Sequence, residues 1–158
     1  MLDNIKNLLR ENRKEILKLS WVIFFCYSIL MLWQVFIGPY RSSSGIRRYN
    51  LYPFKTIWNY FVNSEQYSFH ILFINLAANI VTFIPLGFFM PLLFKGFNST
   101  IIMAVFSAII TIVIESMQFV FNVGVFDIDD IILNTLGCII GFALYKKVKL
   151  AMNKLEEF

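Results

Sequence analysis

Long apolar blocks separated by short polar stretches dominate the pattern of this chain. Four blocks, at about residues 19–37, 71–94, 101–121 and 128–145, are long enough for helices that cross a bilayer, which needs roughly 20 residues. The pattern therefore predicts an all-α integral membrane protein. We expect a small bundle of four transmembrane helices plus short interfacial helices, in a single domain that covers residues 1–158.

Residues 40–70 form a long polar segment between the first two blocks, and part of it is amphipathic. Its apolar residues recur at helical spacing and share one face: Phe54, Ile57, Trp58, Phe61 and Val62. This pattern predicts a short helix on the membrane interface, with Pro53 in its first turn. In the second apolar block, Pro85 and Pro91 are expected to interrupt the helix and to bend it near Pro85 and Gly87, because proline cannot donate a backbone hydrogen bond.

Composition excludes a water-soluble globular domain. Hydrophobic residues make up 58% of the chain and charged residues 15%, where soluble domains carry about 25% charged residues. The mean hydropathy is +0.67. The two cysteines, Cys26 and Cys138, lie inside apolar runs without a CxxC pattern, so neither a disulfide framework nor a cysteine metal site is expected.

The distribution of basic residues predicts the topology. The net charge is +4, and basic residues flank the apolar blocks, which favours a lipid partner over nucleic acid. Ten of the fourteen Lys and Arg residues fall in the N-terminal segment, at Lys95 and in the C-terminal segment. Because cytoplasmic loops are enriched in Lys and Arg, we expect a multi-pass protein of the cell membrane with both termini in the cytoplasm.

Polar residues inside the apolar blocks give candidates for a functional site. A helix rises about 1.5 Å per residue, so the polar residues of the second, third and fourth spans are expected at the same depth, in the outer half of the membrane. Polar residues of the first outer loop are expected at the same level. The candidates are Asn75, Asn79, Glu115, Gln118, Asp127, Asp129, Asp130 and Asn134 of the spans, with Arg47, Arg48 and Asn50 of the loop. The spacing predicts one connected, outward-facing polar cluster into which Arg47 or Arg48 reaches.

A structural explanation of the same residues remains open. Asp127 followed by Asp130 resembles a capping arrangement at the start of a helix. The asparagines suit hydrogen bonds between helices, and Gly137 and Gly141, four residues apart, suit close helix packing. Under this interpretation the polar groups only hold the bundle together, and the protein is a scaffold.

Four sequence blocks, taken in order, resemble the signature of the VanZ-like family of membrane proteins. They are RYNLYPFKT (48–56), NLAANIVTFIPLG (75–87), ESMQ (115–118) and DIDDIILNTLG (127–137). Many members have an arginine just before the last block, but this chain has Gly124-Val125-Phe126 there, so no role for that arginine carries over. The resemblance implies a link to resistance against teicoplanin and related glycopeptide antibiotics.

Two chemical roles for the site are considered, a binding role that the resemblance implies and that the positions of the residues suit, and an enzymatic role. As a binding site, it would hold a lipid-linked cell-wall precursor or a lipoglycopeptide at the outer leaflet. Arg47 and Arg48 suit phosphate or carboxylate, and the amides of Asn50, Asn75, Asn79, Gln118 and Asn134, with Asp129, suit sugar or peptide groups. This is the favoured hypothesis.

The alternative is a membrane-embedded enzyme. Glu115, Asp127 and Asp130 are its candidate catalytic residues, and with Asp129 they could bind a divalent cation or carry out acid–base chemistry on a headgroup. No nucleophile motif supports it, because Ser116 has no neighbouring histidine and His70 is isolated. Transport is least favoured, since four spans lack the repeated halves of most transporters.

Overall fold

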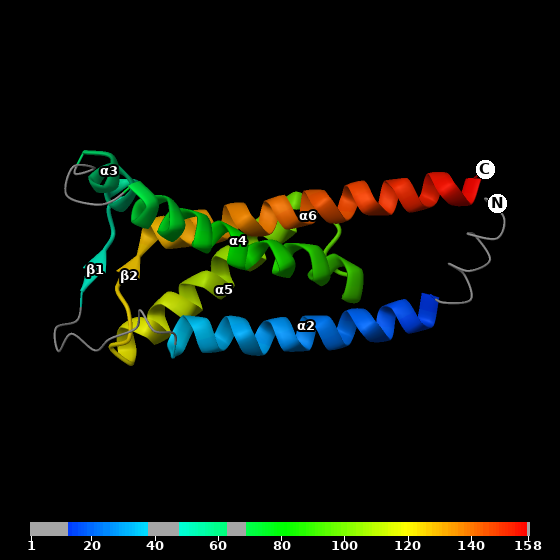
Figure 1. The fold of residues 1–158 in the computed structure, drawn as a ribbon, viewed down its shortest axis with the longest axis horizontal. Coiled ribbons are helices and arrows are strands. Elements are labelled where there is room, and N and C mark those ends of the chain that lie inside the picture. The colour runs from blue at the N-terminus through cyan, green and yellow to red at the C-terminus, as the bar shows by residue number, and fades with distance from the viewer. Residues whose placement is uncertain (1–12, 38–47, 63–68, 158) are drawn as a thin grey trace.

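The computed structural model describes residues 13–37, 48–62 and 69–157, and these are predominantly helical (Figure 1). In order, the elements are α2 (Arg13–Phe36), β1 (Tyr49–Asn50), α3 (Lys55–Val62), α4 (Phe69–Leu93), α5 (Thr100–Val120), β2 (Phe126–Asp127) and α6 (Ile128–Glu157). The two strands are two residues long and form one parallel pair. The predicted all-α class is thus confirmed.

Four of these helices, α2, α4, α5 and α6, are long and apolar enough to cross a membrane. Large apolar side chains on all four are exposed, for example Leu30 (65%), Val81 (60%), Val105 (54%) and Leu144 (43%). An exterior of this kind suits lipid rather than water. The protein is therefore a multi-pass membrane protein, as the sequence predicts.

Helices α4 and α6 run side by side in the same direction, and glycines let their backbones touch (Figure 1). A Cβ atom built on Gly137 would lie 2.1 Å from the carbonyl oxygen of Ile80, and one on Gly141 would lie 2.0 Å from that of Ile84. Gly87 of α4 lies in the same way against the backbone of Cys138. The expectation that Gly137 and Gly141 allow close helix packing is confirmed.

Two expectations about prolines are wrong. Helix α4 continues through Pro85 and Pro91 to Leu93 without interruption, because membrane helices tolerate proline where neighbouring helices and local adjustment compensate for the missing backbone bond. The bend near Pro85 and Gly87 stays a prediction. Pro53 does not lie in the first turn of α3. It lies in a tight turn before the helix, in which the Lys55 N–H donates to the Tyr52 carbonyl (3.3 Å) and Phe54 has a φ of 63°.

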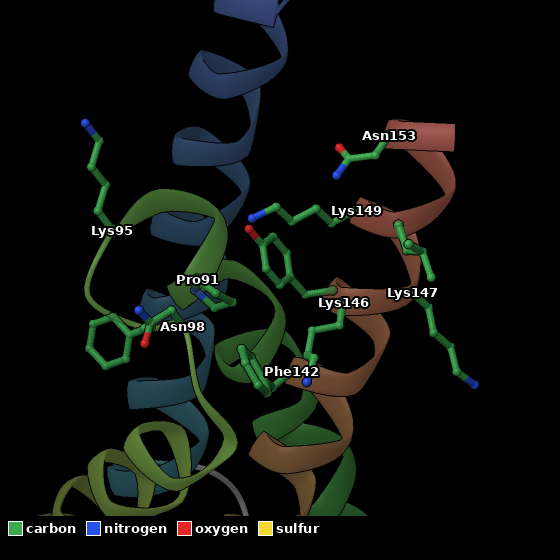
Figure 2. A pocket seen from close by; sticks show the side chains of 11 residues that line it. Pro91, Lys95, Asn98, Phe142, Lys146, Lys147, Lys149 and Asn153 are labelled. Atoms are coloured by element: carbon green, nitrogen blue, oxygen red, sulfur yellow. The ribbon is translucent and has the colours of Figure 1, made fainter. Parts of the chain in front are cut away.

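The two ends of the bundle differ in character. One end holds β1, β2 and α3, and is called the polar end below (Figure 1). The other, called the basic end, holds the link between α4 and α5 and the last turns of α6, which carry Lys95, Lys146, Lys147 and Lys149 (Figures 1 and 2). The first residues of α6 and the segment before α3, which carry candidate site residues, lie at the polar end (Figure 1).

Candidate functional site

The parallel pairing of β1 with β2 brings the segment before α3 against the start of α6. Tyr49 pairs with Phe126 and Asn50 with Asp127, and the Phe126 N–H donates to the Arg48 carbonyl (3.2 Å). In this register the Asn50 amide donates to Oδ1 of Asp127 (3.1 Å). A residue of the loop thus becomes a direct partner of a carboxylate 77 positions later.

Asp127 joins three parts of the fold through both carboxylate oxygens and its own backbone. Its Oδ1 accepts the N–H of Asp129 (2.9 Å), so it caps the N-terminus of α6 as the structural interpretation predicted. Its Oδ2 accepts the hydroxyl of Thr56 (2.5 Å). Its N–H donates to Oε2 of Glu115 on α5 (3.2 Å). Asp127 is 7% exposed, so these partners replace the water that a carboxylate needs.

Asp129 is fully buried, and it holds the N-terminus of α3. Its two oxygens accept the backbone N–H groups of Phe54, Thr56 (2.8 Å) and Ile57 (3.1 Å). The first N–H groups of a helix have no partner within the helix, and a negative charge beside them is favourable. Asp129 therefore acts as the cap of a helix more than 70 positions earlier in the chain.

The remaining carboxylates connect α6 with α4 and α5. Asp130 accepts a hydrogen bond from the side-chain amide of Asn79 on α4. Glu115 is 3% exposed and accepts the Asp127 N–H described above. Together, Glu115, Asp127, Asp129 and Asp130 are called the acid cluster here. The cluster ties α3, α4, α5 and α6 to one another at the polar end.

Two predicted site residues lie apart from these hydrogen bonds. The Gln118 amide donates to the Val35 carbonyl (2.8 Å), a carbonyl of the last turn of α2 that has no donor within the helix. Gln118 therefore attaches α2 to α5. Asn134 is 4% exposed, and its Oδ1 has no hydrogen-bond partner among the described residues. A buried acceptor of this kind is uncommon and leaves hydrogen-bonding capacity next to the cluster.

The predicted arginines and Asn75 are the least determined part of the site. Arg48 is exposed, and its bond with the site is made by its backbone carbonyl rather than by its guanidinium. Arg47 lies outside the described residues. Asn75 belongs to α4, but its side chain lies outside the described part of the chain as well. Any reach of Arg47 or Asn75 into the acid cluster stays a prediction.

Sequence reasoning overlooked Thr56 and the backbone of α3. The Thr56 hydroxyl donates a hydrogen bond to Asp127 and accepts one from the Asn50 amide (3.0 Å). The backbone N–H of Thr56 donates to Asp129. A signal was present, because Thr56 is the last residue of the 48–56 block that carries the family resemblance. Its role could not be inferred from periodicity, since a threonine near a helix start suits capping, solvent or packing equally well.

The arrangement favours hydrogen bonding over metal binding among the described residues. Within residues 13–37, 48–62 and 69–157, no group of three or more His, Cys, Asp or Glu side chains is placed to hold a metal ion. The oxygens of Asp127 and Asp129 instead face N–H and O–H donors. These two carboxylates fix the geometry of the polar end, and Glu115, Asp130 and Asn134 lie beside that frame.

Comparison with known proteins agrees with the blocks noted in the sequence. The sequence model of the VanZ/LLP1 family matches residues 22–151. The chain belongs to the VanZ/LLP1 family. Protein VanZ of Enterococcus faecium is 27% identical over 141 residues, which cover 86% of this chain and 79% of that protein. No solved structure matches.

The VanZ/LLP1 match includes the whole acid cluster. It begins within α2 and ends within α6, so it also contains β1, β2, α3 and the glycine contacts between α4 and α6. The polar end therefore lies within the family region rather than in an appendage of this chain. The resemblance to the VanZ-like family is confirmed.

Proposed function

We propose that this VanZ-like protein acts in resistance to teicoplanin-type glycopeptide antibiotics, with its polar end engaging a lipid-linked cell-wall precursor or a lipoglycopeptide. The observation that carries the proposal is the acid cluster holding α3 across the end of a membrane bundle. Buried carboxylates are costly in a membrane protein and are commonly functional. Here they fix the position of a short amphipathic helix beside the spans.

The exposed surface of α3 and its preceding turn suits an amphiphilic ligand. Phe54, Trp58 and Val62 are 60%, 67% and 59% exposed, which leaves an apolar face beside the bundle. Tryptophan commonly lies at the level of lipid headgroups. A ligand with a lipid tail and a polar headgroup would contact this face with one part and the polar end with the other.

Two exposed cations lie at the polar end, Lys55 on α3 itself and Arg48 directly before β1. The ammonium of Lys55 lies 5.2 Å from the centre of the Tyr52 ring. A guanidinium and an ammonium suit the phosphates of a lipid-linked precursor or the carboxylate of a lipoglycopeptide. Oδ1 of Asn134, which has no partner within the described part of the chain, offers a further polar contact.

We propose that the protein lies in the plasma membrane, with the polar end outside the cell and both termini in the cytoplasm. The distribution of Lys and Arg supports this orientation. In a Cys26→Ala background, we expect a membrane-impermeant maleimide added to intact cells to label a Tyr49→Cys variant. An Asn98→Cys variant should react only after the membrane is opened. Both parent residues are at least partly exposed, so the reverse pattern would contradict the orientation.

Binding to the precursor is expected to depend on Arg48 and Lys55. In nanodiscs, the Arg48→Ala, Lys55→Ala double variant should bind a labelled lipid-linked precursor or teicoplanin at least tenfold more weakly than the wild type, about 1.4 kcal/mol. The Lys14→Ala, Lys154→Ala variant removes the same charge from exposed positions at the other end and should bind normally. In cells, only the first variant should lower the teicoplanin resistance that the wild type confers. A wild type that binds neither ligand would rule the proposal out.

Glu115→Gln separates binding from catalysis. A glutamine keeps a carbonyl acceptor for the Asp127 N–H, so the variant should fold, reach normal abundance and retain the ligand. If the wild type converts the labelled precursor and Glu115→Gln binds it without turnover, the protein is an enzyme that uses this carboxylate. Binding without turnover by both proteins supports the binding role proposed here.

A further inference from the structure

A cavity of about 660 Å³ opens at the basic end, between the link from α4 to α5 and the last turns of α6 (Figure 2). It lies at the opposite end of the bundle from the acid cluster, and no part of the proposed function uses it. Lys95 lies on one rim and Lys146 and Lys149 on the other. No Asp or Glu is among the described residues that line it.

The walls of the cavity combine cations with an apolar surface. The ammonium of Lys149 lies 5.8 Å from the centre of the Tyr145 ring. The ammonium of Lys146 lies 5.3 Å from the centre of the Phe142 ring. Phe142 itself is buried (2% exposed), and Pro91 adds to the apolar wall. In Figure 2, the Lys147 ammonium points away from the cavity, and the Lys95 side chain extends outward from the rim rather than toward Phe142.

The cavity is lined by Pro91 near the end of α4 and by Lys95, Phe97 and Asn98 of the link to α5. Since α4 and α5 are candidate spans, we expect this link to lie at the edge of the apolar layer, at the level of lipid headgroups. At this level a phospholipid places its phosphate beside its first acyl carbons. Basic pockets between membrane helices are known to take anionic headgroups.

We propose that this cavity binds the phosphate headgroup of an anionic phospholipid. Lys95, Lys146 and Lys149 neutralise the headgroup, and the Phe142 and Pro91 surface receives the adjoining acyl carbons. Free phosphate would satisfy the ammonium groups but would leave the apolar wall unused. A zwitterionic lipid would match the wall but would bring its own cation toward three lysines. The combination of both surfaces in one cavity favours the anionic lipid.

Native mass spectrometry of the full chain in detergent tests this assignment. The probes are phosphatidylglycerol and phosphatidylcholine with the same acyl chains, and inorganic phosphate. Wild type should retain phosphatidylglycerol at least tenfold better than phosphatidylcholine, and the Lys95→Gln, Lys146→Gln, Lys149→Gln variant should lose that preference. The matched control is Lys14→Gln, Lys18→Gln, Lys154→Gln, which removes the same charge from positions that do not line the cavity, and it should retain the preference.

Each other outcome overturns the proposal. If both triple variants lose the preference for phosphatidylglycerol equally, diffuse positive charge rather than this cavity attracts the lipid. Displacement of the bound lipid by millimolar inorganic phosphate, with phosphate adducts on the wild type, would assign the cavity to a free anion. If the triple variant does not yield folded protein, Lys149→Gln alone should reduce the preference severalfold, and no reduction would refute the site.

Discussion

The Gly137→Leu variant is expected to lose the packing of α4 against α6, and with it most of the protein that survives extraction in detergent. Even the first carbon of a side chain at this position would lie 2.1 Å from the carbonyl oxygen of Ile80, a backbone atom that cannot rotate away. The helices would have to separate along their whole contact, because Gly141 and Gly87 hold the same two backbones together. We expect the free energy of unfolding to fall by about 3 kcal/mol or more, at the upper end of the range for overpacked interiors.

Thermal unfolding in a fixed detergent, together with the yield of monodisperse protein, measures this effect. Gly137→Ala carries the same first carbon and should already lower the unfolding temperature clearly. Gly96→Ala is the matched control, since no described residue other than its chain neighbours would lie within 4 Å of the added Cβ, and it should leave the unfolding temperature unchanged. A Gly137→Leu protein as stable as the Gly96→Ala protein would show that α4 and α6 do not touch in this way.

The second large effect is expected for Asp129→Ala, which should detach α3 from the bundle while leaving the spans folded. The substitution removes the acceptor of three backbone N–H groups, those of Phe54, Thr56 and Ile57, in a place that water does not reach. Hydrogen bonds to a charged group contribute about 1.5–3 kcal/mol each, and unsatisfied buried donors add a penalty. The left-handed φ of 63° at Phe54 adds strain that these bonds hold in place.

Hydrogen exchange of residues 48–62 is the suitable measurement, because the change is local. Amide protection of this segment should fall by at least tenfold in Asp129→Ala, with protection in α4 and α6 retained. The protection of this segment in Asp129→Asn should lie between that of the wild type and that of Asp129→Ala, since asparagine keeps one acceptor oxygen but loses the charge. Asn59→Ala, an exposed position on α3 itself, is the matched control and should exchange like the wild type. Unchanged protection in Asp129→Ala would show that α3 is held by other contacts.

The expectation for Asp129→Ala bears on how the acid cluster works. Asp127 and Asp129 meet donors from the backbone, Thr56 and Asn50, so their charge is used to shape the polar end. Substituting them should disturb ligand binding by moving α3. Arg48 and Lys55 are exposed, and substituting them should weaken binding without moving this helix. The hydrogen-exchange and binding measurements together separate these two causes of lost function.

Much of the fold follows from the sequence because the lipid environment restricts the choices. Apolar blocks of the right length must be helices in a membrane, since backbone polar groups have to be satisfied within the segment. Helical spacing alone also places Asp130, Gly137 and Gly141 on one face. That face does meet α4, through the Asn79 amide near the start of α6 and the glycine contacts further along it.

Only the tertiary structure decided which partners these faces meet. Asp129 caps α3, Asn50 bonds Asp127, and Gln118 bonds the last turn of α2, with partners 73 to 83 positions apart in the chain. Local pattern cannot specify such pairs, because a carboxylate at a helix start can be satisfied by its own helix, by water or by a distant backbone. The sequence determined the helices and the end at which polar groups gather. Packing determined which of those groups build the frame, since the short β1–β2 pairing and the glycine contacts set the distances between segments.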